Sequence, residues 1–131
     1  MDRKKFGFTL VEILVVITVI GVLMAMAFVA YSGFRVSGRD NRRKADLANI
    51  ASALEIYRAD CGQYPVSITF GSALSGDQAQ CSGNSYMAKV PVDPLNTGSS
   101  VYIYTSPAGN KTFSVCAVLE RGGASYCVNN P

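Results

Sequence analysis

Few side chains in this sequence could do chemistry, and one of them stands where its charge would be costly. The 131 residues include nine Asp and Glu residues, four Cys and no His. Without His, the chain has no His-based general acid or base and no His-containing triad or metal site. The exceptional carboxylate is Glu12, which lies inside an apolar run from Phe8 to about Ala30. An acidic side chain in a hydrocarbon layer costs about 3 kcal/mol or more, so Glu12 is expected to be functional and to have a partner.

The other acidic residues do not form an enzyme-like constellation. Asp60 and Asp93 are too far apart in the sequence to be paired by spacing, and no nucleophile stands beside a plausible base. The sequence therefore predicts a protein that is not an enzyme. It predicts no catalytic residue, no cofactor and no metal ligand.

The apolar run is long enough to cross a membrane as a helix. It has about 23 residues, and a hydrocarbon core of about 30 Å needs about 20. Arg3, Lys4 and Lys5 stand just ahead of it, which predicts a cytoplasmic N-terminus and an exported remainder. Residues 1–7 hold three of the 12 basic and one of the nine acidic residues, so the rest sums to 9 − 8 = +1. The net charge of +3 thus comes mostly from these residues and does not indicate nucleic-acid binding.

The start of the run resembles a known processing signal. A short basic leader ends in Gly7, and Phe8-Thr9-Leu10-Val11-Glu12 opens the apolar segment. This pattern is similar to the N-terminal signal of type IV pilins and type II secretion pseudopilins. The resemblance implies that a prepilin peptidase cuts between Gly7 and Phe8 and methylates the new terminus at Phe8. It also implies that Glu12 acts in assembly, and that identical subunits polymerise with the help of an assembly platform and a motor.

The role of Glu12 can also be argued from electrostatics. Cleavage would give Phe8 a positive α-amine, which could meet Glu12 of a neighbour or of the same chain. At about 4 Å and an effective dielectric constant near 20, this pair is worth roughly 4 kcal/mol before desolvation. Because desolvation offsets much of that gain, the pair is expected to select the stagger between helices rather than to add much stability.

Two simpler interpretations of the same segment stay open. The first is an ordinary single-span anchor for an extracytoplasmic domain. The second is a secretory signal peptide, for which Ala25-Met26-Ala27 is an A-x-A cleavage site. Neither interpretation requires Glu12 or the junction of Gly7 with Phe8.

Helical structure is expected to continue beyond the span. No Pro occurs before Pro65, so nothing forces an earlier stop. The weakest part is 31–38, where Ser and Gly residues cost helix stability. The helix is expected to end near Ala59, just before Gly62 and Pro65. This ending resembles that of the first helix in major pseudopilins of type II secretion and in related short pilins, through Tyr57, Asp60, Gly62, Tyr64 and Pro65.

A basic cluster lies in the second half of this helix. It could contact DNA, but the acidic residues interleaved with it favour a solvated or subunit-facing stripe. Asp40 and Lys44 form an i,i+4 pair in the favourable orientation. Nucleic acid is therefore a partner that the sequence does not support. The cluster consists of Arg39, Arg42, Arg43 and Lys44.

Three strand-like runs follow the Pro-rich turn at 91–94. They cover 101–105, 112–119 and 125–128, and turn residues separate them. One face of the second run is expected to pack on an apolar stripe of the helix, which gives an α+β fold with one long helix and a small antiparallel sheet. The strand face consists of Phe113, Val115, Ala117 and Leu119, and the helix stripe of Leu47, Ile50, Leu54 and Tyr57.

The four cysteines all lie beyond the span, where an even count predicts two disulfides. A tight hairpin would place Cys116 opposite Cys127, with Cβ atoms about 4.5–5.5 Å apart. Of the three connectivities, we therefore expect Cys61–Cys81 and Cys116–Cys127.

The chain thus divides into a leader (1–7), a transmembrane or filament-core helix (8–30), an amphipathic helix (31–60), a loop-rich connector (61–100) and a small sheet (101–131). The main prediction is a type IV pilin, anchored in the membrane and then assembled into a cell-surface filament for adhesion, motility or DNA uptake. The alternative is the major pseudopilin of a type II secretion or competence apparatus.

The resemblance to major pseudopilins implies a calcium ion in an acidic C-terminal loop. Glu120 is the only acid after Leu119, so no metal site is expected here.

Overall fold

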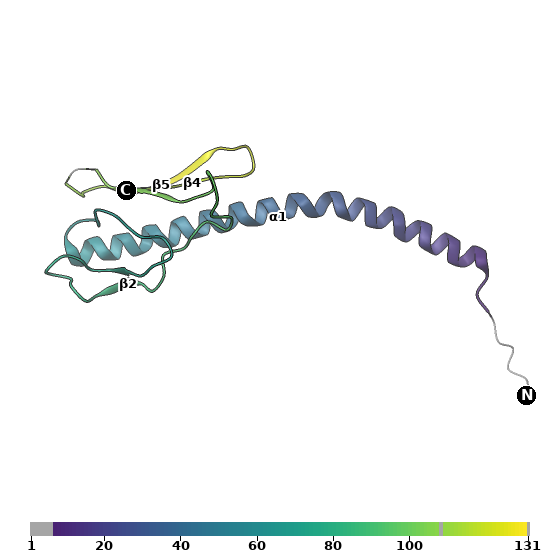
Figure 1. Ribbon diagram of the computed structural model, residues 1–131, viewed down its shortest axis with the longest axis horizontal. Helices are drawn as coiled ribbons and strands as arrows, with labels where there is room; N and C mark the ends of the chain where they lie inside the picture. The colour runs from purple at the N-terminus through teal and green to yellow at the C-terminus, as the bar shows by residue number, and fades with distance from the viewer. Residues whose placement is uncertain (1–6, 108, 131) are drawn as a thin grey trace, which may run out of the picture. The chain divides into compact units, whose positions relative to one another are not determined.

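The structure is a computed structural model that describes residues 7–107 and 109–130. Residues 1–6 of the expected leader lie outside the described residues. The elements follow the order α1 (Leu10–Cys61), β1 (Leu74–Ser75), β2 (Ser85–Met87), β3 (Ile103–Thr105), β4 (Ser114–Val118) and β5 (Ser125–Asn129) (Figure 1). The expected α+β fold is confirmed. The chain forms two compact units that meet between Arg35 and Val36. We call residues 7–35 the apolar segment and residues 36–130 the head.

Helix α1 is 52 residues long and runs without interruption through the weak region at 31–38. Each Gly there costs only about 1 kcal/mol relative to Ala, and no Pro removes a backbone hydrogen bond. The helix ends at Cys61, two residues later than expected. Gly62 then takes a left-handed φ of 78°, and its N–H donates to the Arg58 carbonyl at 2.8 Å. This is a glycine C-cap, and Pro65 prevents further helix.

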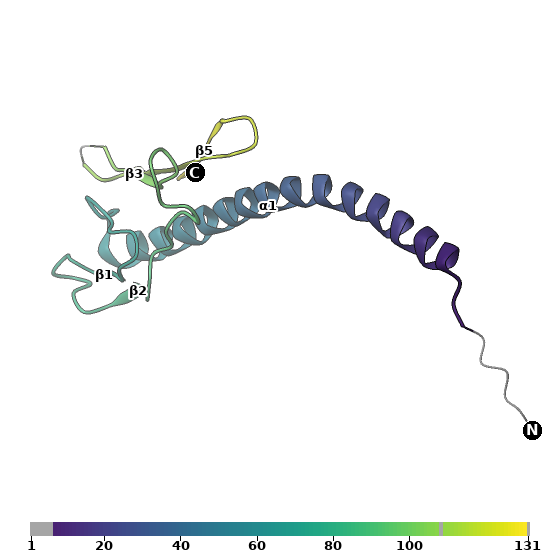
Figure 2. The same cartoon turned by 45° about the vertical axis from the view of Figure 1, so that its right-hand side comes forward.

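The head contains a three-stranded antiparallel sheet with β4 between β3 and β5. Its buried residues alternate along β4, where Val115 and Ala117 face the core. These two residues, together with Phe113, share one apolar cluster with the predicted stripe of α1. Leu119, expected on the same face, is only half-buried because β4 ends one residue before it. The sheet lies along one side of the C-terminal half of α1 (Figures 1 and 2).

A second, smaller sheet forms inside the region expected to be a connector of loops. Strands β1 and β2 pair antiparallel, with Leu74 opposite Met87. They lie on a different side of α1 from the three-stranded sheet, as both views in Figures 1 and 2 show. Leu74 is buried in the core, and the rings of Tyr86 and Tyr57 are 5.0 Å apart between centroids. The connector is therefore part of the folded head.

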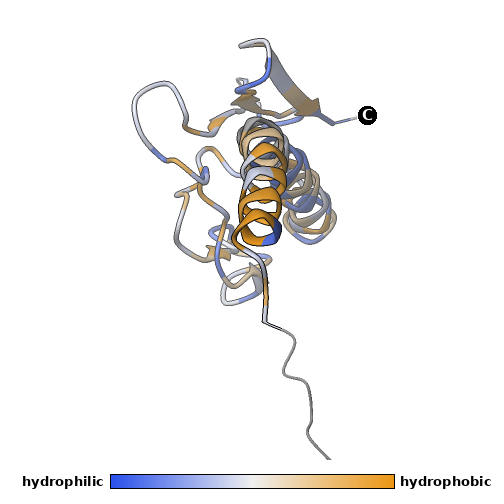
Figure 3. Cartoon of the chain, turned by 90° about the vertical axis from the view of Figure 1, so that its right-hand side faces the viewer, coloured by the Kyte–Doolittle hydropathy of each residue, from blue (hydrophilic) through white to orange (hydrophobic). Residues whose placement is uncertain are grey.

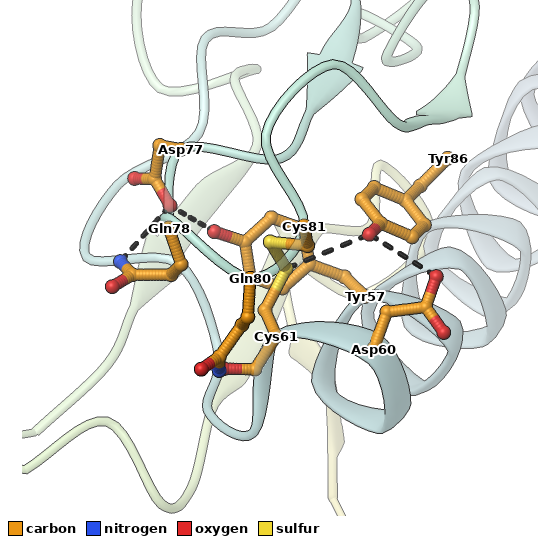
Figure 4. Close-up of a disulfide and its surroundings, with 8 residues drawn as sticks. All are labelled: Tyr57, Asp60, Cys61, Asp77, Gln78, Gln80, Cys81 and Tyr86. Carbon is orange, nitrogen blue, oxygen red and sulfur yellow. Dashed lines mark hydrogen bonds between the residues drawn. A yellow bond between two sulfur atoms is a disulfide. The ribbon is translucent and has the colours of Figure 1, made fainter.

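Two disulfides close the head, and they join the pairs that were expected. Cys61 and Cys81 lie with Cα atoms 5.3 Å apart, and both are buried. Around them, Tyr57 donates a hydrogen bond to Asp77, and Gln80 donates one to the Cys61 carbonyl (Figure 4). The Cys61–Cys81 disulfide therefore fixes the segment after α1 to the end of the helix.

The second disulfide crosses the β4–β5 hairpin. Cys116 and Cys127 are direct partners in the strand register, with Cα atoms 4.1 Å apart. The turn between the strands contains Gly122 and Gly123, both with positive φ. That conformation is available to Gly at little cost, and it sets the register that brings the two cysteines together.

Candidate assembly site

The apolar segment exposes its large side chains along its described length. Ile13 and Leu14 are each 51% exposed, and Phe28 is 81% exposed. An 18-residue window of α1 has a mean hydropathy of 2.9, and none of its residues is buried. The N-terminal turns of α1 are accordingly mostly orange in Figure 3. Among the described residues, α1 is the one helix long and apolar enough to cross a membrane. Because apolar surface is driven out of water, this segment requires lipid or neighbouring helices as its surroundings.

Thr9 and Glu12 cap the start of α1 by exchanging hydrogen bonds. The backbone N–H of Glu12 donates to Thr9 Oγ1 at 3.2 Å, and the backbone N–H of Thr9 donates to Glu12 Oε2 at 3.5 Å. This reciprocal pair is a capping box, which satisfies two N–H groups that a helix start leaves without helical partners. The carboxylate also interacts favourably with the positive end of the helix dipole. The T-x-x-E spacing is visible in the sequence, although the assembly role predicted for Glu12 does not depend on it.

The predicted cleavage junction lies just ahead of this cap, in residues that belong to no helix or strand. Phe8 is 80% exposed. A Cβ atom built on Gly7 would meet no other atom within 4 Å. The fold therefore does not require glycine at this position, and a requirement for it would come from a processing enzyme.

The structure brings the predicted processing and assembly residues to one place, the start of α1. The capping box holds the Glu12 carboxylate beside the backbone nitrogen of Thr9, one residue from the nitrogen of Phe8. Cleavage after Gly7 would turn that second nitrogen into a charged amine. The pairing of this amine with Glu12 stays a prediction, with the geometry of the cap as its support.

A second group of charged residues forms a unit that the sequence does not predict. The Arg43 side chain is fully buried and donates to both carboxylate oxygens of Asp93, from Nε at 2.6 Å and from Nη2 at 3.0 Å. Its Nη1 atom donates to Asp40 at 2.8 Å and to Glu120 at 2.7 Å. Arg39 binds both oxygens of Glu120, from Nε at 2.7 Å and from Nη2 at 2.6 Å. We call these five residues the arginine cluster.

The arginine cluster keeps its carboxylates ionised. Burial raises the pKa of Asp93, but the hydrogen bonds from Arg43 and from two backbone N–H groups outweigh it, so this pKa lies below its ordinary value. Burial also raises the pKa of Asp40, but hydrogen bonds from two backbone N–H groups and from Arg43 outweigh it, so this pKa is lowered as well. The hydrogen bond from Arg39 lowers the pKa of Glu120 to about 2. The hydrogen bond to Asp93 raises the pKa of Arg43.

The predicted solvated stripe is therefore wrong for Arg43, which is buried among acids of the head, and Arg39, although partly exposed, binds Glu120. Arg42 and Lys44 are both exposed and fit the prediction; the Arg42 side chain is 66% exposed and makes a loose contact to Asp46 at 3.8 Å. Asp40 pairs with Arg43 rather than with Lys44, whose Nζ atom lies 5.6 Å from the ring centroid of Tyr126. A sequence signal did exist in the i,i+3 spacing of Asp40 and Arg43.

Comparison with known proteins decides the family. Residues 2–28 match the prokaryotic N-terminal methylation motif, and residues 35–124 match the family of type II secretion system (T2SS) protein G. The chain belongs to the type II secretion protein G family. The second match covers most of the chain, including the whole arginine cluster and three of the four cysteines.

Relatives of the protein G family resemble this chain along most of its length. It is similar to the type II secretion system core protein G of Pseudomonas aeruginosa, with 30% identity over 126 residues, which are 92% of this chain and 87% of that protein. The proteins of the same name from Escherichia coli and Vibrio cholerae are each 26% identical over 125 residues. Those matches cover 91% and 92% of this chain and 84% of each relative. No solved structure matches the chain significantly.

Membership of the protein G family confirms one prediction and corrects another. The family consists of structural pseudopilin subunits, so the chain is not an enzyme, as predicted. The main prediction, a cell-surface pilus for adhesion or motility, is not supported. The match favours the alternative, a pseudopilin of type II secretion.

Proposed function

We propose that this chain is the major subunit of a type II secretion pseudopilus. One observation carries the proposal: an exposed apolar segment, opened by the Thr9–Glu12 cap, is joined to a head of the protein G family. A lone soluble chain could not keep such a segment in water. A membrane protein that later packs side by side with its copies could keep this segment covered, first by lipid and then by neighbouring helices.

The proposed sequence of events begins in the inner membrane. The apolar segment spans the bilayer with its N-terminus in the cytoplasm and the head in the periplasm. A prepilin peptidase cleaves between Gly7 and Phe8 and methylates the amine of Phe8. The exposure of Phe8 and the open space around Gly7 are consistent with access by such an enzyme.

Assembly then transfers the apolar segment from lipid to the core of a polymer of identical subunits in the periplasm. In the proposal, Glu12 of one subunit pairs with the Phe8 amine and sets the stagger between helices. The assembly platform and motor of the secretion apparatus would supply the work. The polymer would act by moving folded cargo, and the chain itself would catalyse no reaction.

Deletion of the gene tests this function directly. The deletion is expected to stop the export of folded proteins from the periplasm to the medium, and to leave surface filaments and twitching motility unchanged. Re-expression of the unsubstituted chain should restore export, whereas a chain carrying Gly7→Val should not. Normal export together with loss of surface filaments would show that the chain is a type IV pilin instead.

A further inference from the structure

The arginine cluster ties three distant parts of the head to one buried cation. Asp40 and Arg43 lie on α1, Asp93 lies in the Pro-rich turn, and Glu120 follows β4. The guanidinium of Arg43 contacts all three carboxylates, and its side chain is 0% exposed. Within the described residues, every buried side-chain nitrogen and oxygen atom has a hydrogen-bond partner. The cluster is therefore fully satisfied, which is the condition under which buried charges hold a structure together.

The carboxylates of the cluster also organise the loops that carry them. Asp40 accepts hydrogen bonds from the backbone N–H groups of Glu120 and Arg121, both at 2.9 Å. Asp93 accepts one from the backbone N–H of Leu95, also at 2.9 Å. The turn after β4 is thus anchored to α1 through both its main chain and its side chain.

The resemblance to major pseudopilins implies a calcium ion in an acidic C-terminal loop, and the residues of this chain do not fit one. Calcium takes six to eight oxygen ligands at about 2.3–2.6 Å. The loop after Leu119 offers one carboxylate, Glu120, and both of its oxygens bind guanidinium groups. In the parts of the chain that the structure describes, no group of three or more His, Cys, Asp or Glu residues could hold a metal.

We propose that Arg43 takes the structural place of a divalent cation in this protein, so that the turn after β4 folds and stays ordered without calcium. The buried guanidinium supplies the positive charge at the point where carboxylates from α1, the Pro-rich turn and the end of β4 meet. Arg39 closes the outer side of Glu120. The proposal concerns the head alone, and it holds whether or not the chain serves secretion.

Thermal unfolding of the purified full-length chain in detergent tests this proposal. The Tm of the head, followed by circular dichroism, is expected to be the same in excess EDTA and in about 1 mM calcium, the weak end of calcium affinities in extracellular modules. Hydrogen exchange at 119–124 is likewise expected to be the same in both buffers. A Tm that falls by about 4 °C or more in EDTA and recovers with calcium would overturn the proposal.

A substitution within the arginine cluster tests whether its ion pairs hold the turn after β4 in place. Glu120→Gln keeps the size of the side chain and removes its charge, so it is expected to lower the Tm by about 4–8 °C in both buffers and to speed exchange at 119–124. The matched control is Arg42→Gln, which removes an exposed arginine of the same helix and is expected to leave the Tm and the exchange rates unchanged. Equal effects of the two substitutions, or no effect of Glu120→Gln, would contradict the proposal.

Discussion

Glu12 combines two roles that one substitution can separate. Its carboxylate completes the capping box with Thr9, and it is also the proposed partner of a charged amine at Phe8. A glutamine serves in a capping box as well as a glutamate does, because its side-chain oxygen still accepts the N–H of the N-cap residue. A glutamine cannot form an ion pair.

Glu12→Gln is therefore expected to leave insertion, cleavage and the helix start intact but to abolish polymer formation. The measurement is chemical cross-linking of subunits in cells, with N-terminal sequencing to show that cleavage still occurs. Thr9→Val is the matched control, because it removes the other half of the cap at a cost of about 0.5–2 kcal/mol and keeps the charge. Normal polymers from the Glu12→Gln chain would show that assembly does not need the charge of Glu12.

Gly7 is expected to matter to the processing enzyme alone. Since a Cβ atom there would meet nothing within 4 Å, Gly7→Val should fold and insert like the unsubstituted chain. We expect it to accumulate with residues 1–7 still attached, as seen by intact mass. An unchanged Tm of the head serves as the control. Cleavage at the normal rate would contradict the proposed junction.

The lowered pKa of Glu120 indicates how the stability of the head depends on pH. Its pKa is about 2 in the folded chain, below an ordinary value of 4.5, because Arg39 and Arg43 donate to it. A lowered pKa stabilises the folded state above pH 4.5, and this stabilisation is lost as the pH falls toward 2. We expect it to be about 1–2 kcal/mol, since the side chain still contacts solvent.

The measurement is urea unfolding of the unsubstituted chain and of Glu120→Gln at several pH values. The difference between their free energies of unfolding should be constant from pH 7 to about pH 5 and should shrink between about pH 4.5 and 2. A difference that does not change with pH would mean that the charge of Glu120 does not stabilise the head.

At the scale of elements, the two disulfides should contribute unequally. Cys61–Cys81 links residues 20 apart in the sequence, and both sulfurs belong to the core. Cys116–Cys127 links residues 11 apart in a hairpin that already has paired strands, and Cys127 is exposed. Loss of the first bond also removes the covalent link between the end of α1 and the segment that carries β1.

Replacing Cys61 and Cys81 together with Ala is expected to cost about 3–5 kcal/mol and to expose the segment between them to proteases. Replacing Cys116 and Cys127 together with Ser is expected to cost less, about 1–3 kcal/mol, because the hairpin register persists. Denaturant unfolding of both double variants measures the difference. Equal losses would show that the core position of the first bond adds nothing.

The sequence predicted the elements whose signals are local. The periodic stripe from Leu47 to Tyr57, the Gly62–Pro65 stop and the hairpin that opposes Cys116 and Cys127 all depend on neighbours close in the chain. Strands β1 and β2 have only two and three residues, too few to show an alternating pattern. They pair with each other across the turn that contains Cys81.

The arginine cluster could not be predicted because its members are far apart in the sequence. Asp93 and Glu120 lie 50 and 77 residues from Arg43, so only the folded head brings them together. From sequence alone, four basic residues on a helix are typical of an exposed stripe. Burial of Arg43 reverses that interpretation, because a charge without water needs acidic partners.

For the whole molecule, the exposed apolar segment is the feature that the rest must explain. Its side chains have no cover within the described chain, and the head already has its own satisfied core. Lipid before assembly and identical helices after assembly would each provide that cover. This exchange of surroundings connects the fold of one subunit to the proposed secretion pseudopilus.

The most direct test is the intact mass and N-terminal sequence of the chain from cells with an active secretion apparatus. The proposed function predicts a chain that begins at N-methylated Phe8. A chain that keeps Met1 would indicate a plain membrane anchor, and one that begins at Phe28 would indicate a cleaved secretory signal. Either of these results would contradict the proposed roles of Gly7, Phe8 and Glu12.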